Sequence, residues 1–103
     1  MSVLAIWTWS ARTEDEDDVR AALDELVEHC ETEHPLIKRL AWFSAPAKDG
    51  PMTEFRWLEE YESRETMAQD EFTPVCEALW EPVKSRAVDF GGKAFDQGGV
   101  LER

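Results

Sequence analysis

Two hydrophobic periodicities alternate along this chain of 103 residues, and their order is the strongest constraint on its fold. Four segments are rich in β-branched and aromatic side chains and read as strands: 3–11, 36–44, 53–61 and 89–97. Two longer regions, which follow residues 13 and 63, repeat their apolar side chains every three or four residues, as helices do. The resulting order, β-α-β-β-α-β, is that of a split β-α-β unit.

The first helix has well-marked boundaries. Thr13 is the expected N-cap, and the five acidic residues that follow it suit the positive end of the helix dipole. His34 is the expected last residue, because the following Pro35 disfavours helical geometry in the residue before it. The expected buried stripe consists of Val19, Ala22, Leu23, Leu26, Val27 and Cys30.

The second helical region, residues 64–88, is interrupted by prolines. Ser63 is its expected N-cap. The pair Thr73-Pro74 predicts a break into a short first piece and a longer second piece. Pro82 lies inside the longer piece and predicts a kink, because proline cannot donate the helical hydrogen bond.

The strands are apolar on both faces, as Ile6 and Trp7 illustrate in the first of them. The turn-forming residues 45–51 predict an antiparallel hairpin between the second and third strands, and the glycines at 91–92 predict a bulge or bend in the fourth. Two helices cover only one face of a four-stranded antiparallel sheet, so the other face would be a large apolar patch on a monomer. We therefore expect one α+β, ferredoxin-like domain over residues 1–103, with two helices on one face and a homodimer formed through the other.

The charge balance excludes several classes of partner. With 11 basic and 23 acidic residues the net charge is −12, which disfavours binding to nucleic acids and to anionic lipids. Such acidity also fits a halophilic host. No apolar stretch approaches the roughly 18 residues of a membrane span, and the N-terminus lacks the basic start of a signal peptide. We expect a soluble cytoplasmic protein.

The segment 58–72 (LEEYESRETMAQDEF) resembles the dimeric α+β barrel superfamily, and within it the antibiotic-biosynthesis-monooxygenase-like (ABM-like) domains. The resemblance rests on the acidic–aromatic pair Glu60-Tyr61 and the helix cap Ser63, and the element order agrees over residues 3–96. It implies a dimeric α+β barrel with a pocket between the helices and the sheet of each subunit. Many family members carry a His early in the second helix, whereas residues 67–71 here have none. The chain also contains no Asn, so the haem-degrading branch of the family is not expected.

Glu60 and Tyr61 are the candidate catalytic residues, expected near the rim of that pocket. Glu60 fits a base or a substrate-binding group, and alternatively an ion pair with Arg39 or Arg56 across the hairpin. A set of aromatic side chains either lines the pocket for a flat substrate or fills the core and the dimer interface. This set consists of Trp7, Trp9, Phe55, Trp57 and Trp80.

Metal-binding side chains gather at the end of the first helix, where His29, Cys30, Glu33 and His34 lie within six residues. A zinc site needs three or four ligands, and the sequence offers no second cluster to complete one. The favoured alternative is a pair of histidines near the negative end of the helix dipole, so no metal is expected. Cys30 and Cys76 both lie on buried stripes and are expected as reduced thiols, with a redox pair as the alternative.

Two functions remain open from the sequence. The resemblance implies a cofactor-independent, monooxygenase-like enzyme that acts on a small aromatic or polyketide-like compound activated for direct reaction with oxygen. The alternative is a non-catalytic homodimer, either a small-ligand-binding protein or a structural one.

Overall fold

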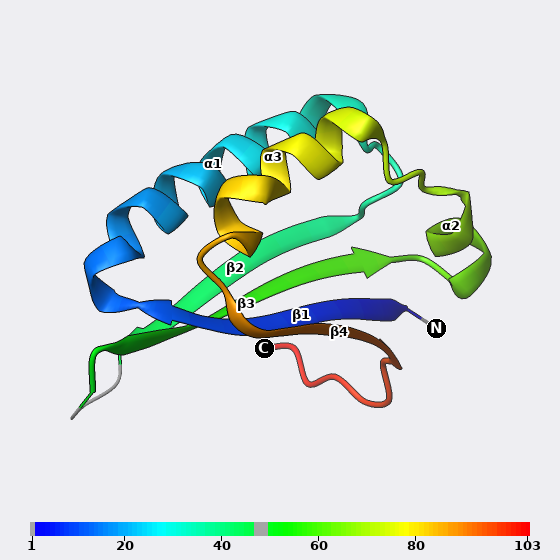
Figure 1. Ribbon diagram of the computed structural model, residues 1–103. Helices are drawn as coiled ribbons and strands as arrows, with labels where there is room; N and C mark the ends of the chain where they lie inside the picture. The colour runs from blue at the N-terminus through cyan, green and yellow to red at the C-terminus, as the bar shows by residue number, and fades with distance from the viewer. Residues whose placement is uncertain (1, 47–49) are drawn as a thin grey trace.

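The computed structural model describes residues 2–46 and 50–103 (Figure 1). Its elements are β1 (Val3–Arg12), the short 3-10 turn η1 (Thr13–Asp15), α1 (Glu16–Glu33), β2 (Arg39–Pro46), β3 (Met52–Tyr61), α2 (Arg64–Gln69), α3 (Pro74–Lys84) and β4 (Val88–Asp96). The expected turn between the second and third strands includes residues 47–49, which lie outside the described part. No helix of that part is long and apolar enough to cross a membrane.

The strands form one antiparallel sheet in the order β2-β3-β1-β4. Helices α1 and α3 lie side by side across one face of it, and α2 lies at the end of β3 (Figure 1). The expected α+β, ferredoxin-like fold, with a four-stranded antiparallel sheet and its helices on one face, is therefore confirmed.

The core lies between the sheet and the two long helices. Trp9 of β1 stacks on Phe55 of β3 at 5.7 Å between ring centroids, and Trp80 of α3 meets Trp57 edge-on at 5.0 Å. The alternation of β1 and β3 puts these rings on the helix-facing side, and the stripe of α1, including Leu23 and Leu26, covers them. Paired aromatics in such geometry add about 0.5–1.5 kcal/mol each beyond their burial, so this layer fixes the helices against the sheet.

Some local expectations need correction. Thr13 does not cap α1, because its hydroxyl lies 3.2 Å from that of Thr53 and the chain first makes a 3-10 turn. Strand β2 begins at Arg39 rather than at residue 36, because a turn closed by the hydrogen bond from Ile37 N–H to the His34 carbonyl follows α1.

In the second helical region, the break at Thr73-Pro74 is confirmed, and Ser63 caps α2 by accepting a hydrogen bond from Thr66 N–H. Pro82 lies inside α3, as expected, and the helix runs two residues beyond it.

The irregularity in β4 lies next to the two glycines rather than at them. The β1–β4 register shifts between Thr8 and Ser10, opposite the part of β4 where Asp89 has a positive φ of 56°. Asp adopts this left-handed conformation more readily than most residues. Gly92 has a different role, described below.

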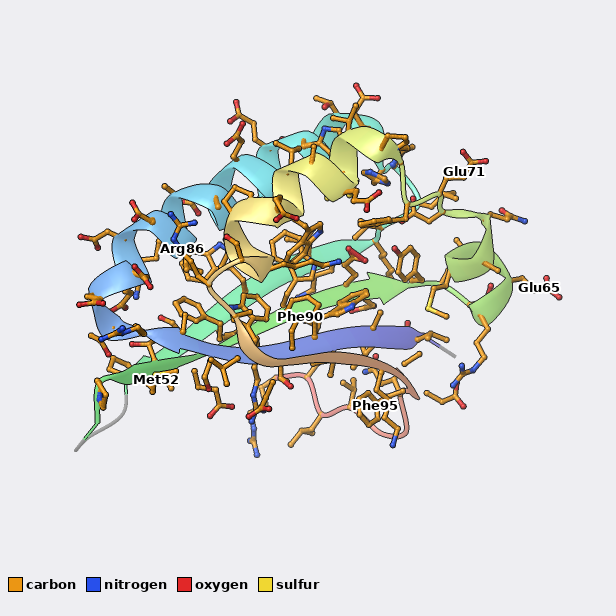
Figure 2. All side chains as sticks on the ribbon, viewed as in Figure 1. Met52, Glu65, Glu71, Arg86, Phe90 and Phe95 are labelled. Atoms are coloured by element: carbon orange, nitrogen blue, oxygen red, sulfur yellow. The ribbon has the colours of Figure 1, made fainter. Side chains whose placement is uncertain are left out.

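The face of the sheet away from the helices is open in the monomer. Figure 2 shows Phe95 pointing away from the helices and Phe90 lying between the sheet and α3. Phe43 and Phe95 are exposed, and Leu4, Ile6 and Leu58 are half-buried on the same side of the sheet. The apolar second face expected from the strand pattern is therefore present.

Candidate functional site

A pocket of about 560 Å³ opens between the sheet and the helical layer. Its walls are contributed by β1, β3, β4, the end of α1, and the segment from α2 through α3. Its lining side chains include the apolar Trp7, Met67, Phe72, Trp80 and Phe90 and the polar Cys30, His34, Glu59, Tyr61, Asp70, Cys76 and Lys84. The pocket thus combines aromatic and other apolar side chains with a group of acidic and phenolic side chains on one wall, as small-molecule sites commonly do.

The expected aromatic set divides into two layers. Trp7 and Trp80 line the pocket, whereas Trp9, Phe55 and Trp57 are buried in the core and are absent from the pocket lining. The set is therefore divided between the pocket lining and the core.

Gly92 leaves room for the indole ring of Trp7 on the pocket wall. A Cβ at position 92 would lie 2.4 Å from Nε1 of Trp7 and 2.5 Å from its Cδ1. The indole therefore rests on the backbone of β4, in space that any other residue would occupy. By contrast, a Cβ at Gly91 would meet nothing within 4 Å.

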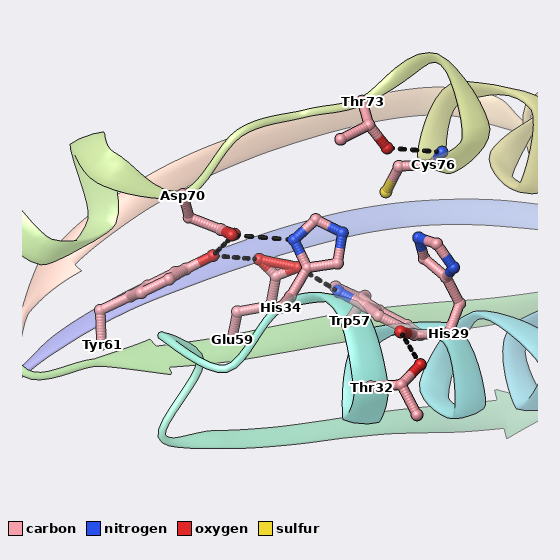
Figure 3. Close-up of polar contacts among 9 residues, drawn as sticks. All are labelled: His29, Thr32, His34, Trp57, Glu59, Tyr61, Asp70, Thr73 and Cys76. Atoms are coloured by element: carbon pink, nitrogen blue, oxygen red, sulfur yellow. Dashed lines mark hydrogen bonds and ion pairs between the residues drawn. The ribbon is translucent and has the colours of Figure 1, made fainter.

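The polar wall is a continuous chain of side chains (Figure 3). Nε1 of Trp57 donates a hydrogen bond of 3.2 Å to Oε1 of Glu59. The hydroxyl of Tyr61 lies 3.0 Å from Oε2 of Glu59 and 2.6 Å from Oδ2 of Asp70. Nδ1 of His34 lies 2.8 Å from Oδ1 of Asp70. The network joins β3, the end of α1 and the link that follows α2.

The hydrogen count in this network identifies a protonated carboxyl group. Tyr61 has a single hydroxyl hydrogen, yet its oxygen contacts two carboxyl groups. We place that hydrogen in the shorter contact, with Tyr61 as the donor to Asp70. The contact with Glu59 is then a hydrogen bond only if Glu59 is protonated and donates to the Tyr61 oxygen. In this arrangement Glu59 still accepts from Trp57, and every polar atom between Trp57 and His34 has a partner.

The electrostatics agree with this count. Burial raises the pKa of Glu59 above its ordinary value, an effect that the hydrogen bond accepted from Trp57 only partly opposes. Burial and the hydrogen bond to Asp70 raise the pKa of Tyr61 above its ordinary value, so its phenol stays protonated. Asp70, with 16% of its side chain exposed, then receives hydrogen bonds from both neighbours and remains reachable from the pocket.

The two cysteines are free, as expected. Burial raises the pKa of Cys30 to about 12. Burial likewise raises the pKa of Cys76. Neither thiol is therefore a reactive nucleophile in this environment.

Of the two candidate catalytic residues, only Tyr61 lies in the pocket. Glu60 projects from the other face of β3, and its Oε2 lies 3.6 Å from Nζ of Lys38. Glu60 thus forms an ion pair, as its alternative interpretation predicted, but the partner is Lys38 and neither Arg39 nor Arg56. The carboxyl group of β3 that lines the pocket belongs to the preceding residue, Glu59.

Three site residues were missed from the sequence, for different reasons. Glu59 alternates with Phe55, Trp57 and Tyr61 on the buried face of β3, and that pattern alone marks a carboxyl group among core aromatics. His34 was expected at the end of the first helix and weighed there as a metal ligand, but it was not expected in the pocket. Asp70 follows a six-residue helix, and nothing local indicates that it reaches the pocket.

Comparisons with known proteins bear on the fold. No family model matches the sequence, and no curated protein matches it. Solved structures do match. The cofactor-independent oxygenase SnoaB from Streptomyces nogalater has a TM-score of 0.73 at 6% identity, covering 100% of both chains. The chain folds as antibiotic biosynthesis monooxygenases do.

Two further structures agree with this result. A structure described as an antibiotic biosynthesis monooxygenase has a TM-score of 0.73 at 22% identity, covering 94% of this chain and 99% of the other. A dimeric protein of unknown function with a ferredoxin-like fold, from Bacteroides fragilis, has a TM-score of 0.73 at 11% identity, covering 93% and 96%. At these identities the likeness shows the fold alone, which is the ABM-like fold that residues 58–72 indicated.

Proposed function

We propose that this protein is a cofactor-independent, monooxygenase-like enzyme that oxidises a small, flat aromatic or polyketide-like compound. The observation that carries the proposal is the chain from Glu59 through Tyr61 and Asp70 to His34 on one wall of a pocket that also contains four aromatic side chains. The likeness of the fold to SnoaB supports the same reaction class.

In the proposed reaction Asp70 is the general base. It is the carboxyl group of the network that lines the pocket and accepts hydrogen bonds from two neighbours, and it removes a proton from an acidic CH₂ or OH group of the substrate. Tyr61 and His34 position Asp70 by their hydrogen bonds, while the protonated Glu59 holds the Tyr61 oxygen. The product of this step is an electron-rich carbanion or phenolate, the form in which such compounds react directly with oxygen.

The remaining steps balance without a cofactor. For a CH₂ group, the substrate loses both hydrogens and gains one oxygen atom of O₂ as a carbonyl, and the second oxygen atom leaves as water. Carbon loses the four electrons that O₂ accepts.

Lys84 lies 5.6 Å from the ring centroid of Phe90 and 5.8 Å from that of Phe72, so its positive charge lies beside the aromatic wall and favours the anionic intermediate.

The functional unit in this proposal is a cytoplasmic homodimer joined through the open sheet face. Phe43, Phe95 and Ile6 lie on that face, and a large exposed apolar patch marks an interface. The dimeric ferredoxin-like structure from Bacteroides fragilis supports this assembly. A reducing cytoplasm suits the two free thiols.

Oxygen uptake tests the enzymatic proposal. Anthrone is a suitable probe because it is flat, apolar and has an acidic CH₂ group. We expect the protein to accelerate oxygen consumption above the rate in buffer, and Asp70→Asn to lower that rate by about 10²–10⁴-fold. Glu60→Gln is the matched control, since Glu60 faces away from the pocket, and it should leave the rate unchanged.

The alternative, a protein that binds a small ligand without turnover, gives a different result. Anthrone would then quench the fluorescence of Trp7 and Trp80, which line the pocket, while oxygen uptake stayed at the buffer rate for every variant. Uptake that is equal in the wild type and in Asp70→Asn would refute the role of Asp70.

A further inference from the structure

Three metal-binding side chains converge where the end of α1 meets the start of α3. Each of His29, His34 and Cys76 offers one ligand atom, and these three atoms lie within 4.8 Å of one another. The two imidazole rings meet edge-on, with their centroids 5.3 Å apart, and Figure 3 shows the side chain of Cys76 beside them. Cys76 is the third ligand that the sequence lacked, because only the fold brings α3 to this end of α1.

Two of these side chains have buried nitrogen atoms without partners. Nε2 of His29 and Nε2 of His34 are buried and make no hydrogen bond to any residue in the described ranges, 2–46 and 50–103. His34 is only 5% exposed and Cys76 only 6%. Buried polar atoms are nearly always satisfied, so two such atoms beside one thiol call for an explanation.

His34 is also oriented as a metal-binding histidine would be. Its Nδ1 is engaged by Oδ1 of Asp70 at 2.8 Å. With the hydrogen on Nδ1, the lone pair of Nε2 is free and points away from Asp70. Metal-bound histidines typically donate their other ring N–H to a carboxylate in this way, which fixes both tautomer and ring orientation.

We infer that His29, His34 and Cys76 bind a zinc-class metal ion through two imidazole nitrogens and one sulfur. This mixed nitrogen and sulfur set suits Zn²⁺ and excludes Mg²⁺ and Ca²⁺, which require oxygen ligands. Ligand atoms around a tetrahedral Zn²⁺ are about 3.4–3.6 Å apart, given bonds of roughly 2.0–2.3 Å. The three atoms need to approach by no more than about 1.3 Å from their largest separation.

The site has a defined relation to the pocket. His34 and Cys76 both line the pocket, so a fourth ligand, such as a water molecule, has access from that side. Zinc sites with three protein ligands keep the fourth position open for water or another small ligand, whereas structural zinc sites are closed by four protein ligands. The bound ion would also join α1 to α3 at the wall of the pocket.

Cobalt is a direct spectroscopic probe of this site. The purified, chelator-treated protein is titrated with Co²⁺, whose thiolate charge-transfer band and intense visible bands report a sulfur ligand and tetrahedral geometry. We expect saturation at one ion per chain, displacement by Zn²⁺, and no displacement by Mg²⁺. We also expect Zn²⁺ to raise the melting temperature, because it binds the folded chain preferentially.

Matched variants assign the ligands. Cys76→Ser should abolish the charge-transfer band, and His29→Gln should abolish stoichiometric binding. Cys30→Ser removes the neighbouring buried thiol, which is outside the cluster, and should leave both unchanged. Asp70→Asn should weaken binding by about 10–100-fold, as loss of a partner of a metal-bound histidine does. If Cys76→Ser fails to fold, the half-buried His29 still tests the assignment.

The inference fails if the wild type binds neither Co²⁺ nor Zn²⁺ stoichiometrically. It also fails if the charge-transfer band disappears in Cys30→Ser but persists in Cys76→Ser. Neither result concerns oxygen uptake, which is measured on the chelator-treated protein, so this inference and the proposed oxygenase function are refuted separately.

Discussion

Replacing Glu59 by Gln tests whether this buried carboxyl group is protonated in the folded protein. Gln has nearly the same shape, and its carbonyl oxygen can accept the hydrogen bond from Trp57 while its NH₂ group donates to the Tyr61 oxygen. A protonated Glu59 makes the same two hydrogen bonds. We therefore expect the variant to match the wild type in acid and to be more stable at neutral pH.

The sign of the pH dependence follows from the raised pKa. In the unfolded chain Glu59 ionises near its ordinary value of 4.5, whereas burial keeps it protonated to higher pH in the folded protein. Between these two pKa values Glu59 ionises only in the unfolded chain, which lowers the free energy of unfolding. The wild type therefore loses about 1.4 kcal/mol of stability per pH unit relative to Glu59→Gln. The loss begins above pH 4.5 and stops at the folded pKa. It corresponds to roughly 5–10 °C in melting temperature per pH unit.

The assay is thermal or urea unfolding of both proteins between about pH 4 and pH 8. Glu60→Gln is the control, since it removes a carboxylate that is only 13% exposed but lies on the other face of β3, outside the network, where its partner is the 60% exposed Lys38. A stability difference between wild type and Glu59→Gln that is constant over this range, or a wild type that is the more stable at neutral pH, would refute the protonated Glu59.

Two other variants test the pocket wall and the assembly. Gly92→Ala places a methyl group against the Trp7 indole, so we expect a loss of about 1–3 kcal/mol in unfolding measurements and an altered Trp emission, whereas Gly91→Ala should be nearly neutral. Equal effects at both positions would contradict the packing of Trp7 on Gly92. Ile6→Lys puts a charge on the open sheet face and should convert the expected dimer to a monomer in light scattering, whereas Gln69→Lys on the exposed side of α2 should leave the dimer mass unchanged. A dimer that survives Ile6→Lys would place the interface elsewhere.

Much of the fold was predictable because it depends on local patterns. The spacing of Val19, Leu23 and Leu26 marks the buried side of α1, and the Thr73-Pro74 pair marks the start of α3. Period-two alternation places Phe55 and Trp57 on the same face of β3. Errors occurred where a tertiary contact replaced a local preference, as with Thr13, whose hydroxyl lies against Thr53 rather than capping a helix.

The site was less predictable because it joins segments that are distant in sequence. The hydrogen bond between Tyr61 and Asp70 depends on where the link after α2 crosses the sheet, and the contact between His34 and Asp70 spans 36 residues. Choosing Glu60 over Glu59 followed the family resemblance, although strand alternation already placed Glu59 on the aromatic face. Position on the strand was the better guide than the short motif.

Turnover of anthrone under ¹⁸O₂ tests the proposed function most directly. The account predicts anthraquinone that carries one ¹⁸O atom, formed faster than in buffer, with the second ¹⁸O atom in water. The Asp70→Asn protein should form the same product at close to the buffer rate. Labelled product that appears only at the buffer rate with wild-type protein would contradict an oxygenase, and the pocket would then be a binding site without chemistry.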